Sequence, residues 1–417
     1  MTRTTKTLAR VAAALAAALL LASCTIDGKP IAHRPDTAGL DTGRYSVVPL
    51  EPPAGNETTG RVLESARLAE AMLDPSEVDA ALINAPSSVT IAPVPTPASA
   101  TLVLAQSVRP VLERHGMLAG CLVGGSDVAP GPRGVEVGKG RVLLALVMRF
   151  PDAAAAQQAA AEIDTADAAL NPENAAVTIP DYAQAHAHWR PSVPTMAATL
   201  AQDVYVINLL IGHTSPDLAA MTGLARKAFD AQAPRLRSFE PTPQDRLAAL
   251  PLDPDHMVRL MVPDAPDRWS YPGVVSAALQ SAASWDASLV GTGFSYGPRA
   301  TMLFFGPQRR KAGSQPEAMI TNGFDALVRY SDPVTAHRQI EKVRAAAAAD
   351  TTLRPIDPPL GTSDVSCYQN LNPDKPGMSA FLCRFQYGRY TGLVMARNAT
   401  GVRQRSAAQY GLLVNGG

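Results

Sequence analysis

Apolar positions recur along the chain with helical spacing in some stretches and as continuous runs in others. A helix is predicted over residues 61–73, where apolar residues form one stripe and Glu64 lies off it. A second helix is predicted over residues 98–115 and strands over residues 117–123 and 142–150. This order of elements indicates a mixed α and β fold.

A short pattern occurs twice, 180 positions apart. Residues 149–152 (Arg-Phe-Pro-Asp) parallel residues 329–332 (Arg-Tyr-Ser-Asp). In each copy an apolar strand ends in arginine and an aromatic residue, followed by an aspartate that can cap a helix. A strong strand follows each copy, over residues 204–211 and 381–396. An aromatic residue before a capping aspartate is common, so a chance match remains the alternative to a true repeat.

The repeat predicts two similar α+β domains, each a small, mainly antiparallel sheet with helices packed on one face, close to a split β-α-β arrangement. Four prolines in residues 238–256 indicate a linker between them. The expected organisation is a signal peptide (1–23), a lipidated cysteine with a flexible tether (24–59), an N-terminal domain (60–237), the linker (238–256) and a C-terminal domain (257–417).

The first residues carry the signature of export. Arg3, Lys6 and Arg10 precede an apolar run over residues 11–22, which is the length of a signal-peptide core and too short to span a bilayer. The run ends in Leu-Ala-Ser-Cys at Cys24, which resembles a bacterial lipobox. We therefore expect cleavage before Cys24 and lipidation of its thiol. A plain secretory signal with an accidental cysteine is the alternative.

Composition and charge exclude several classes of protein. The 417 residues are 46% apolar and 18% charged, which excludes a disordered chain. Lys+Arg and Asp+Glu are equal at 37 each, and loss of the three basic residues of the signal leaves a net charge of −3. Without a basic excess, we expect no nucleic-acid partner. No cofactor motif stands out, and none is expected.

Cysteine usage agrees with an oxidising compartment. Apart from Cys24, the chain has Cys121, Cys367 and Cys383. Cys367 and Cys383 are 16 positions apart across a turn-rich stretch, so we expect a disulfide between two neighbouring strands and one spare thiol at Cys121. Three free, buried thiols are the alternative.

The sharpest hypothesis for an enzyme concerns Ser295. Residues 293–297 (Gly-Phe-Ser-Tyr-Gly) match the nucleophile-elbow pattern, which requires a strand before the serine and a helix immediately after it. Residues 300–305 instead indicate another strand, so a β-hairpin explains the glycines equally well. Only His337 follows Ser295 in the order that such hydrolases show, and Asp332 is already needed as a cap.

Two histidines form a weak candidate for a metal site. His186 and His188 are two positions apart, so both imidazoles would point the same way on a strand, as zinc ligands must. No third ligand is fixed by spacing. The same alternation describes a strand with one buried and one solvent-exposed face, so no metal is expected.

Several short segments resemble secreted lipoproteins of unknown function from mycobacteria, nocardiae and related actinobacteria. They are the lipobox, residues 40–45 (Leu-Asp-Thr-Gly-Arg-Tyr), residues 63–69 (Leu-Glu-Ser-Ala-Arg-Leu-Ala), and Cys383 with the following residues 388–390 (Gly-Arg-Tyr). The resemblance implies a two-domain envelope lipoprotein and supplies no catalytic residues.

We therefore expect a lipid-anchored protein on the outer face of the cell membrane. Its folded part is expected to be a non-enzymatic module that binds a lipid, glycan or protein partner in the cleft between the domains, where pockets commonly form. A secreted serine hydrolase using Ser295 is the alternative function.

Overall fold

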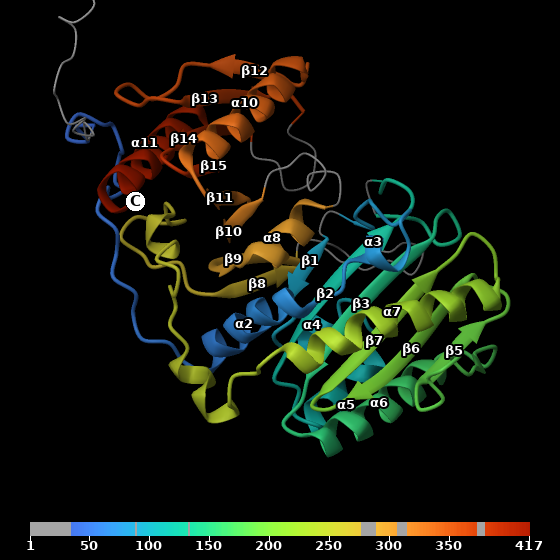
Figure 1. Cartoon of the computed structure of the whole chain (residues 1–417). Coiled ribbons are helices and arrows are strands. Elements are labelled where there is room, and N and C mark those ends of the chain that lie inside the picture. Colours follow the sequence, from blue (N-terminus) through green and yellow to red (C-terminus); the bar gives the residue numbers. More distant parts are fainter. Residues whose placement is uncertain (1–34, 88–89, 132–133, 277–288, 307–314, 373–379) are drawn as a thin grey trace, which may run out of the picture. The chain divides into compact units, whose positions relative to one another are not determined.

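The first half of the chain builds a seven-stranded antiparallel sheet (Figure 1). The computed structural model describes residues 35–87, 90–131, 134–276, 289–306, 315–372 and 380–417. The strand order is β1-β2-β3-β7-β6-β5-β4. The strands are β1 (Ile91–Pro93), β2 (Ala119–Ser126), β3 (Val142–Arg149), β4 (Ala175–Ala176), β5 (His186–Arg190), β6 (Thr195–Gln202) and β7 (Tyr205–Gly212).

The second half builds an eight-stranded antiparallel sheet. Its order is β12-β13-β14-β15-β11-β10-β9-β8. The strands are β8 (Gly273–Ser276), β9 (Leu289–Tyr296), β10 (Pro316–Asn322), β11 (Asp325–Tyr330), β12 (Leu353–Ile356), β13 (Val365–Asn370), β14 (Phe381–Tyr387) and β15 (Tyr390–Ala396). The stretch predicted as one strand over residues 381–396 is thus a hairpin, with Gly388 at a φ of 52° in its turn.

Helices cover both faces of the first sheet. Strand β3 is apolar at seven successive positions, as is typical of a strand buried on both sides. Leu143 faces a core shared with helix α7 (Leu218–Ser238), and Leu144 faces a second core shared with helix α6 (Ala153–Ala168). The predicted α+β class with two antiparallel sheets is confirmed, but the helices do not keep to one face, because this uninterrupted apolar run needs cover on both.

The second sheet is also covered on both faces. Tyr368 and Leu382 pack with helix α10 (Pro333–Ala349). Their neighbours in the strands, Cys367 and Cys383, point to the opposite face and pack with helix α11 (Ala399–Gly416). Helices α10 and α11 therefore lie on opposite sides of this sheet.

The two sheets share one connectivity, which confirms the predicted repeat. The order β2-β3-β7-β6-β5 in the first sheet corresponds to β10-β11-β15-β14-β13 in the second. Helices α6 and α10 follow the corresponding strands β3 and β11, and α7 and α11 follow β7 and β15. Asp152 caps α6 by accepting from Ala155 N at 2.8 Å, and Asp332 caps α10 by accepting from Thr335 N at 2.7 Å.

The remaining helices differ from the prediction in two places. The single helix expected over residues 98–115 is instead three short segments, and Pro110 lies in the first turn of the last one, where its missing N–H costs no helical hydrogen bond. Residues 300–305, predicted as a strand, belong to a helix. The elements are α2 (Glu57–Leu68), α3 (Pro75–Val78), α4 (Pro97–Ala100), α5 (Arg109–Arg114), α8 (Pro298–Phe305) and the 3₁₀ turns η2 (Ala69–Ala71), η3 (Gln106–Val108), η4 (Gln244–Ala249) and η5 (Val258–Leu260).

The proline-rich segment between the halves, residues 238–256, is ordered and is hydrogen-bonded to helix α2. Glu64 Oε1 accepts from Arg149 NH1 at 2.6 Å and from Thr242 N at 3.0 Å. Glu64, which the helical pattern placed off the apolar stripe, is fully buried. A buried carboxylate needs such partners, since desolvation of an unpaired charge is costly.

Residues 37–49, named here the N-terminal strap, pack along helix α11. Val47 O accepts from Asn415 Nδ2 at 2.9 Å, and Asp41 Oδ1 accepts from Gln404 Nε2 at 3.1 Å. The sequence predicted a flexible tether as far as residue 59, but this part of it is bound to the second half, and α2 begins at Glu57. Among the described residues, every helix is too short or too polar to cross a membrane.

Candidate functional site

A small recess lies where strands β1 and β2 meet helix α8. It holds about 250 Å³ of space, part of which is open solvent, and its lining is mainly apolar, with Leu82, Ile83, Val123 and Leu303. Thr90 also lines it, and its hydroxyl donates to the carbonyl oxygens of Leu303 at 2.9 Å and Phe304 at 3.0 Å. The recess therefore lies between segments from both halves of the chain.

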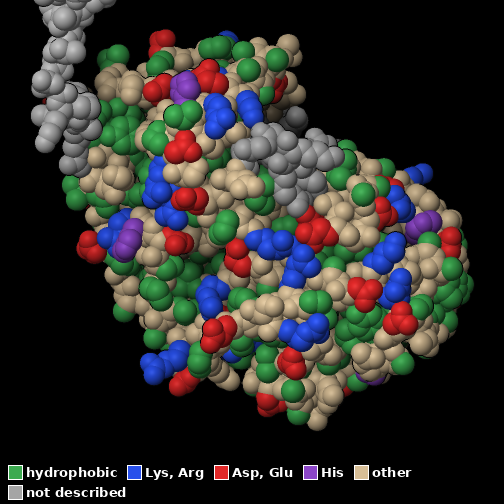
Figure 2. Space-filling model, viewed as in Figure 1, with side chains coloured by type: hydrophobic (Ala, Val, Ile, Leu, Met, Phe, Trp, Pro, Cys, Tyr) green, Lys and Arg blue, Asp and Glu red, His purple; other side chains and the backbone are tan. Residues whose placement is uncertain are grey.

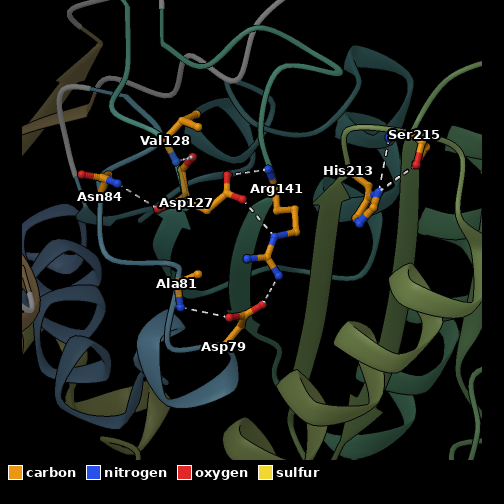
Figure 3. A network of polar contacts seen from close by, with 9 residues as sticks. Asp79, Ala81, Asn84, Asp127, Val128, Arg141, His213 and Ser215 are labelled. Carbon is orange, nitrogen blue, oxygen red and sulfur yellow. Dashed lines mark hydrogen bonds and ion pairs between the residues drawn. The ribbon is translucent and has the colours of Figure 1, made fainter.

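An arginine network holds one wall of this recess in place. Arg141, next to the start of β3, donates through Nε to Asp127 Oδ2 at 2.9 Å and pairs through NH1 with Asp79 (Figure 3). The hydrogen bond to Asp127 raises the pKa of Arg141 further above its usual range, although burial opposes the charge. Asn84 N, in the same wall, donates to Ser126 O at 3.0 Å. The wall is thus tied to the ends of β2 and β3.

The other wall is helix α8, whose first turn is capped by a residue distant in sequence. Glu70 Oε1 accepts from Ala300 N at 2.8 Å, and Oε2 accepts from Arg299 N at 3.2 Å. A carboxylate here satisfies amides that the helix leaves unpaired and complements the positive end of its dipole. This cap joins helix α8 of the second half to the η2 turn of the first.

Ser295 does not occupy a nucleophile elbow. It lies inside strand β9 opposite Ile320, with an ordinary negative φ, whereas an elbow serine sits on a strained turn after its strand. Its hydroxyl donates to Asp255 Oδ2 at 2.8 Å. In a Ser-His-Asp triad, the serine hydroxyl is instead hydrogen-bonded to an imidazole that accepts its proton.

The two glycines of the Ser295 motif have structural roles. Gly293 has a φ of 68° at an irregularity in the pairing of β9 with β10, and a Cβ there would lie 2.3 Å from Ser270 O. Gly297 precedes α8, and a Cβ there would lie 2.9 Å from the Glu70 carboxylate. Close backbone approach therefore explains both glycines without an enzyme.

The two candidate metal ligands, His186 and His188, have different environments. His188 is buried, and its Nδ1 lies 2.7 Å from Asp164 Oδ1, while its Nε2 lies 3.5 Å from Asp167 Oδ2. Burial disfavours the charged imidazole, but hydrogen bonds to the two aspartates outweigh it and raise the pKa of His188 to about 9. His186 is exposed. Within the described residues, no three His, Cys, Asp or Glu side chains are grouped to hold a metal ion.

The cysteines divide into a bonded pair and a buried thiol. The predicted disulfide between Cys367 and Cys383 is present, joining directly opposed residues of β13 and β14 with a Cα–Cα distance of 4.0 Å. Cys121 is free and fully buried. Burial raises the pKa of its thiol far above the usual range, and the charge of Glu70 adds to this, so the reactive thiolate is suppressed. Cys24 lies outside the described residues.

Sequence reasoning missed the contacts that hold the walls of the recess in place. Asp79 and Arg141 are 62 positions apart, and Glu70 and Ala300 are 230 positions apart. Contacts at such separations leave no local pattern. Pro298, which favours the first turn of a helix, is a local signal that the strand prediction over residues 300–305 overlooked.

Comparison with known families accounts for most of the chain. Residues 51–252 match the domain of unknown function (DUF7373) N-terminal, and residues 272–416 match the domain of unknown function (DUF7373) C-terminal. The chain carries both DUF7373 domains. The two DUF7373 matches correspond to the halves that contain the first and the second sheet.

Other comparisons add little to the DUF7373 assignment. No curated protein matches the chain. Among solved structures, the extracellular domain of PknH from Mycobacterium tuberculosis is 16% identical with a TM-score of 0.27, covering 43% of this chain and 96% of that chain. A likeness of this size defines neither the fold nor the function of the DUF7373 protein.

Proposed function

We propose that this DUF7373 protein is an exported lipoprotein of the kind found in mycobacteria and nocardiae, held at the outer face of the cell membrane through Cys24. Its folded part is a non-enzymatic module that binds a partner. The basic and apolar segments before Leu-Ala-Ser-Cys support the anchor. The disulfide between Cys367 and Cys383 suits an oxidising compartment.

The hydrogen bond from Ser295 to Asp255 is the observation that carries the non-enzymatic assignment. It engages the serine of the sharpest catalytic motif with a carboxylate instead of a histidine. The buried carboxylate of Glu64 and the buried imidazole of His188 are likewise bonded to neighbours inside the fold. These three polar groups thus have structural partners.

The recess beside α8 is the proposed contact point for the partner. The space of about 250 Å³ in the recess includes open solvent, so the recess does not enclose a small molecule. A glycan or a protein that inserts a single group is therefore a better candidate than a lipid that the recess would have to enclose. Lys and Arg side chains are interspersed with Asp and Glu on the face shown in Figure 2, which agrees with a partner that is not a polyanion.

Native mass spectrometry of the chain from residue 25 onward, purified from an actinobacterial host, tests the binding function. We expect a carried glycan or peptide to add mass that is lost on denaturation. Ile83→Trp, at a partly exposed position in the recess, should abolish the added mass, whereas Leu170→Trp, at an exposed position elsewhere, should keep it. Equal retention by both variants would exclude the recess.

A fluorophosphonate probe tests the hydrolase alternative directly. The wild-type chain should remain unlabelled at probe concentrations that label a serine hydrolase added as a positive control. Labelling that disappears in Ser295→Ala would establish the enzyme and overturn the proposal.

A further inference from the structure

The N-terminal strap is bonded to helix α11 along most of the helix. Asn415, near the end of α11, donates through Nδ2 to Val47 O at 2.9 Å and to Thr37 Oγ1 at 3.4 Å. Gln404, in its second turn, donates through Nε2 to Asp41 Oδ1 at 3.1 Å. The strap therefore meets the folded part of the chain at helix α11 of the second half. It does not first meet it at α2, the first helix of the first half.

Two glycines of α11 allow the strap to lie close. A Cβ at Gly411 would lie 2.4 Å from Val47 Cγ1, and a Cβ at Gly416 would lie 2.7 Å from Pro49 Cγ. Glycine inside a helix is less favourable than alanine. Contact with the strap gives a reason for Gly411 in the helix interior.

Tyr45 joins the strap to a buried ion pair. Arg405 of α11 donates through NH1 to Tyr45 Oη at 3.1 Å, and its guanidinium lies 5.3 Å from the centroid of the Tyr45 ring. The same guanidinium pairs with Asp325 of β11. Arg405 and Asp325 are both buried, so the strap is attached to the core of the second half.

We propose that the face of the second sheet that carries α11 and the strap is turned toward the membrane. This inference rests on the lipid anchor at Cys24 in the proposed function. From Cys24 to Thr37 the chain advances 13 positions, which span at most about 45 Å when fully extended. A free tether as far as residue 59 would span up to about 120 Å. Because the strap is bound to α11, the distance from the lipid anchor to the folded part is limited to about 45 Å.

Two exposed apolar side chains lie in or beside the strap, where a bilayer surface is the proposed partner. Val48 in the strap is 63% exposed, and Leu360 is 90% exposed. The residue after Leu360, Gly361, lies against the strap, since a Cβ there would be 3.2 Å from Leu40 Cδ2. Large apolar side chains exposed beside an anchored segment gain from contact with the headgroup region of a bilayer.

Energy transfer from the protein to a labelled bilayer tests the orientation. The lipidated full-length chain is placed on vesicles of phosphatidylglycerol and phosphatidylethanolamine that carry an acceptor on their headgroups. A donor is attached at Leu360→Cys or, as the matched control, at Val334→Cys, an exposed position on α10 across the same sheet. In the proposed orientation, position 334 is on the side of the sheet that faces away from the bilayer. We expect at least twofold greater transfer from position 360.

Two further variants separate the possible failures. Cys24→Ser should leave the chain in the supernatant, and a wild-type chain that also stays there would refute the anchor itself. If the wild-type chain binds but positions 334 and 360 transfer equally, the orientation is refuted while the anchor stands. A label at position 360 that is shielded from solvent without transfer would indicate a protein on this face and would also refute the orientation. Asn415→Ala combined with Tyr45→Ala should release the strap from α11. This should reduce the difference in energy transfer between positions 360 and 334.

Discussion

Gln232 and Gln409 make the same pair of backbone hydrogen bonds in the two halves of the chain. Each glutamine is fully buried on the last helix of its half, accepts from a backbone N–H and donates to the carbonyl two residues before it. The bonds measure 2.8 and 2.8 Å for Gln232, and 2.8 and 2.6 Å for Gln409. The partners are Leu73 N, Ala71 O, Val262 N and Leu260 O. Each glutamine thus fixes the segment that leads into its own sheet.

Removal of either glutamine amide should destabilise the protein. Gln232→Ala or Gln409→Ala leaves a buried N–H and a buried C=O unpaired, each of which costs about 1–3 kcal/mol. We expect the free energy of unfolding in urea to fall by about 2–4 kcal/mol in either variant. Gln157→Ala, at an exposed position on α6, should change it by less than about 0.5 kcal/mol. If Gln232→Ala or Gln409→Ala lowers the free energy of unfolding no more than this control, the shared hydrogen bonds do not stabilise the fold.

The local part of the fold could be predicted from sequence. Asp152 and Asp332 follow apolar strands and cap the helices as expected, because capping depends on residues three positions apart. The disulfide between Cys367 and Cys383 was also predictable, since a short turn-rich stretch places neighbouring strands side by side.

The remainder depends on contacts between distant residues. Residues 300–305 are apolar and suit a strand, yet the carboxylate of Glu70 caps them as helix α8. Glu64 looked solvent-exposed on its helix because Arg149, its buried partner, is 85 positions away. The recess depends on the same kind of contact, so the sequence predicted a cleft between the two halves without indicating which residues line it.

The ion pair of Glu64 distinguishes two arginines that share one carboxylate. The side chain of Arg149 is 8% exposed and that of Arg67 is 44% exposed, and each donates to Glu64 at 2.6 Å. Arg149→Met should cost about 3–5 kcal/mol, because it leaves a buried carboxylate without its buried partner. Arg67→Met should cost about 1 kcal/mol or less, since water solvates its surroundings. Equal losses in urea unfolding would contradict this distinction.

His188 should make stability depend on pH above neutrality. Its pKa of about 9 in the folded protein exceeds the value of about 6.5 in an unfolded chain, so folding favours the protonated imidazole. The stabilisation is complete below pH 6.5 and is lost as pH rises through 9. The free energy of unfolding should fall by about 1–3 kcal/mol over this range.

The variants of the two histidines isolate this effect. His188→Gln should be less stable than the wild type at pH 6 and should lack the decline between pH 6.5 and 9, whereas exposed His186→Gln should behave as the wild type. Proton NMR of the His188 ring gives the pKa directly. A ring that titrates at or below 6.5 would refute the role of Asp164 and Asp167.

The cap from Glu70 should control the order of helix α8. Glu70→Ala leaves the amides of Arg299 and Ala300 without their carboxylate, and loss of a helix cap costs about 0.5–2 kcal/mol. Hydrogen exchange of α8 amides should become faster while exchange in α10, capped by Asp332, stays unchanged. Glu113→Ala, which removes an exposed ion pair on α5, is the matched control. Unchanged exchange in α8 would contradict the assigned cap.

The intact mass of the chain extracted with detergent from the membranes of an actinobacterial host tests the central proposal most directly. A lipid-anchored protein should begin at Cys24, with a diacylglyceryl group and fatty acyl chains adding to the mass of residues 24–417. Cys24→Ala should abolish this modification and its membrane retention. A wild-type chain that is cleaved elsewhere, or that carries no lipid on Cys24, would contradict the account.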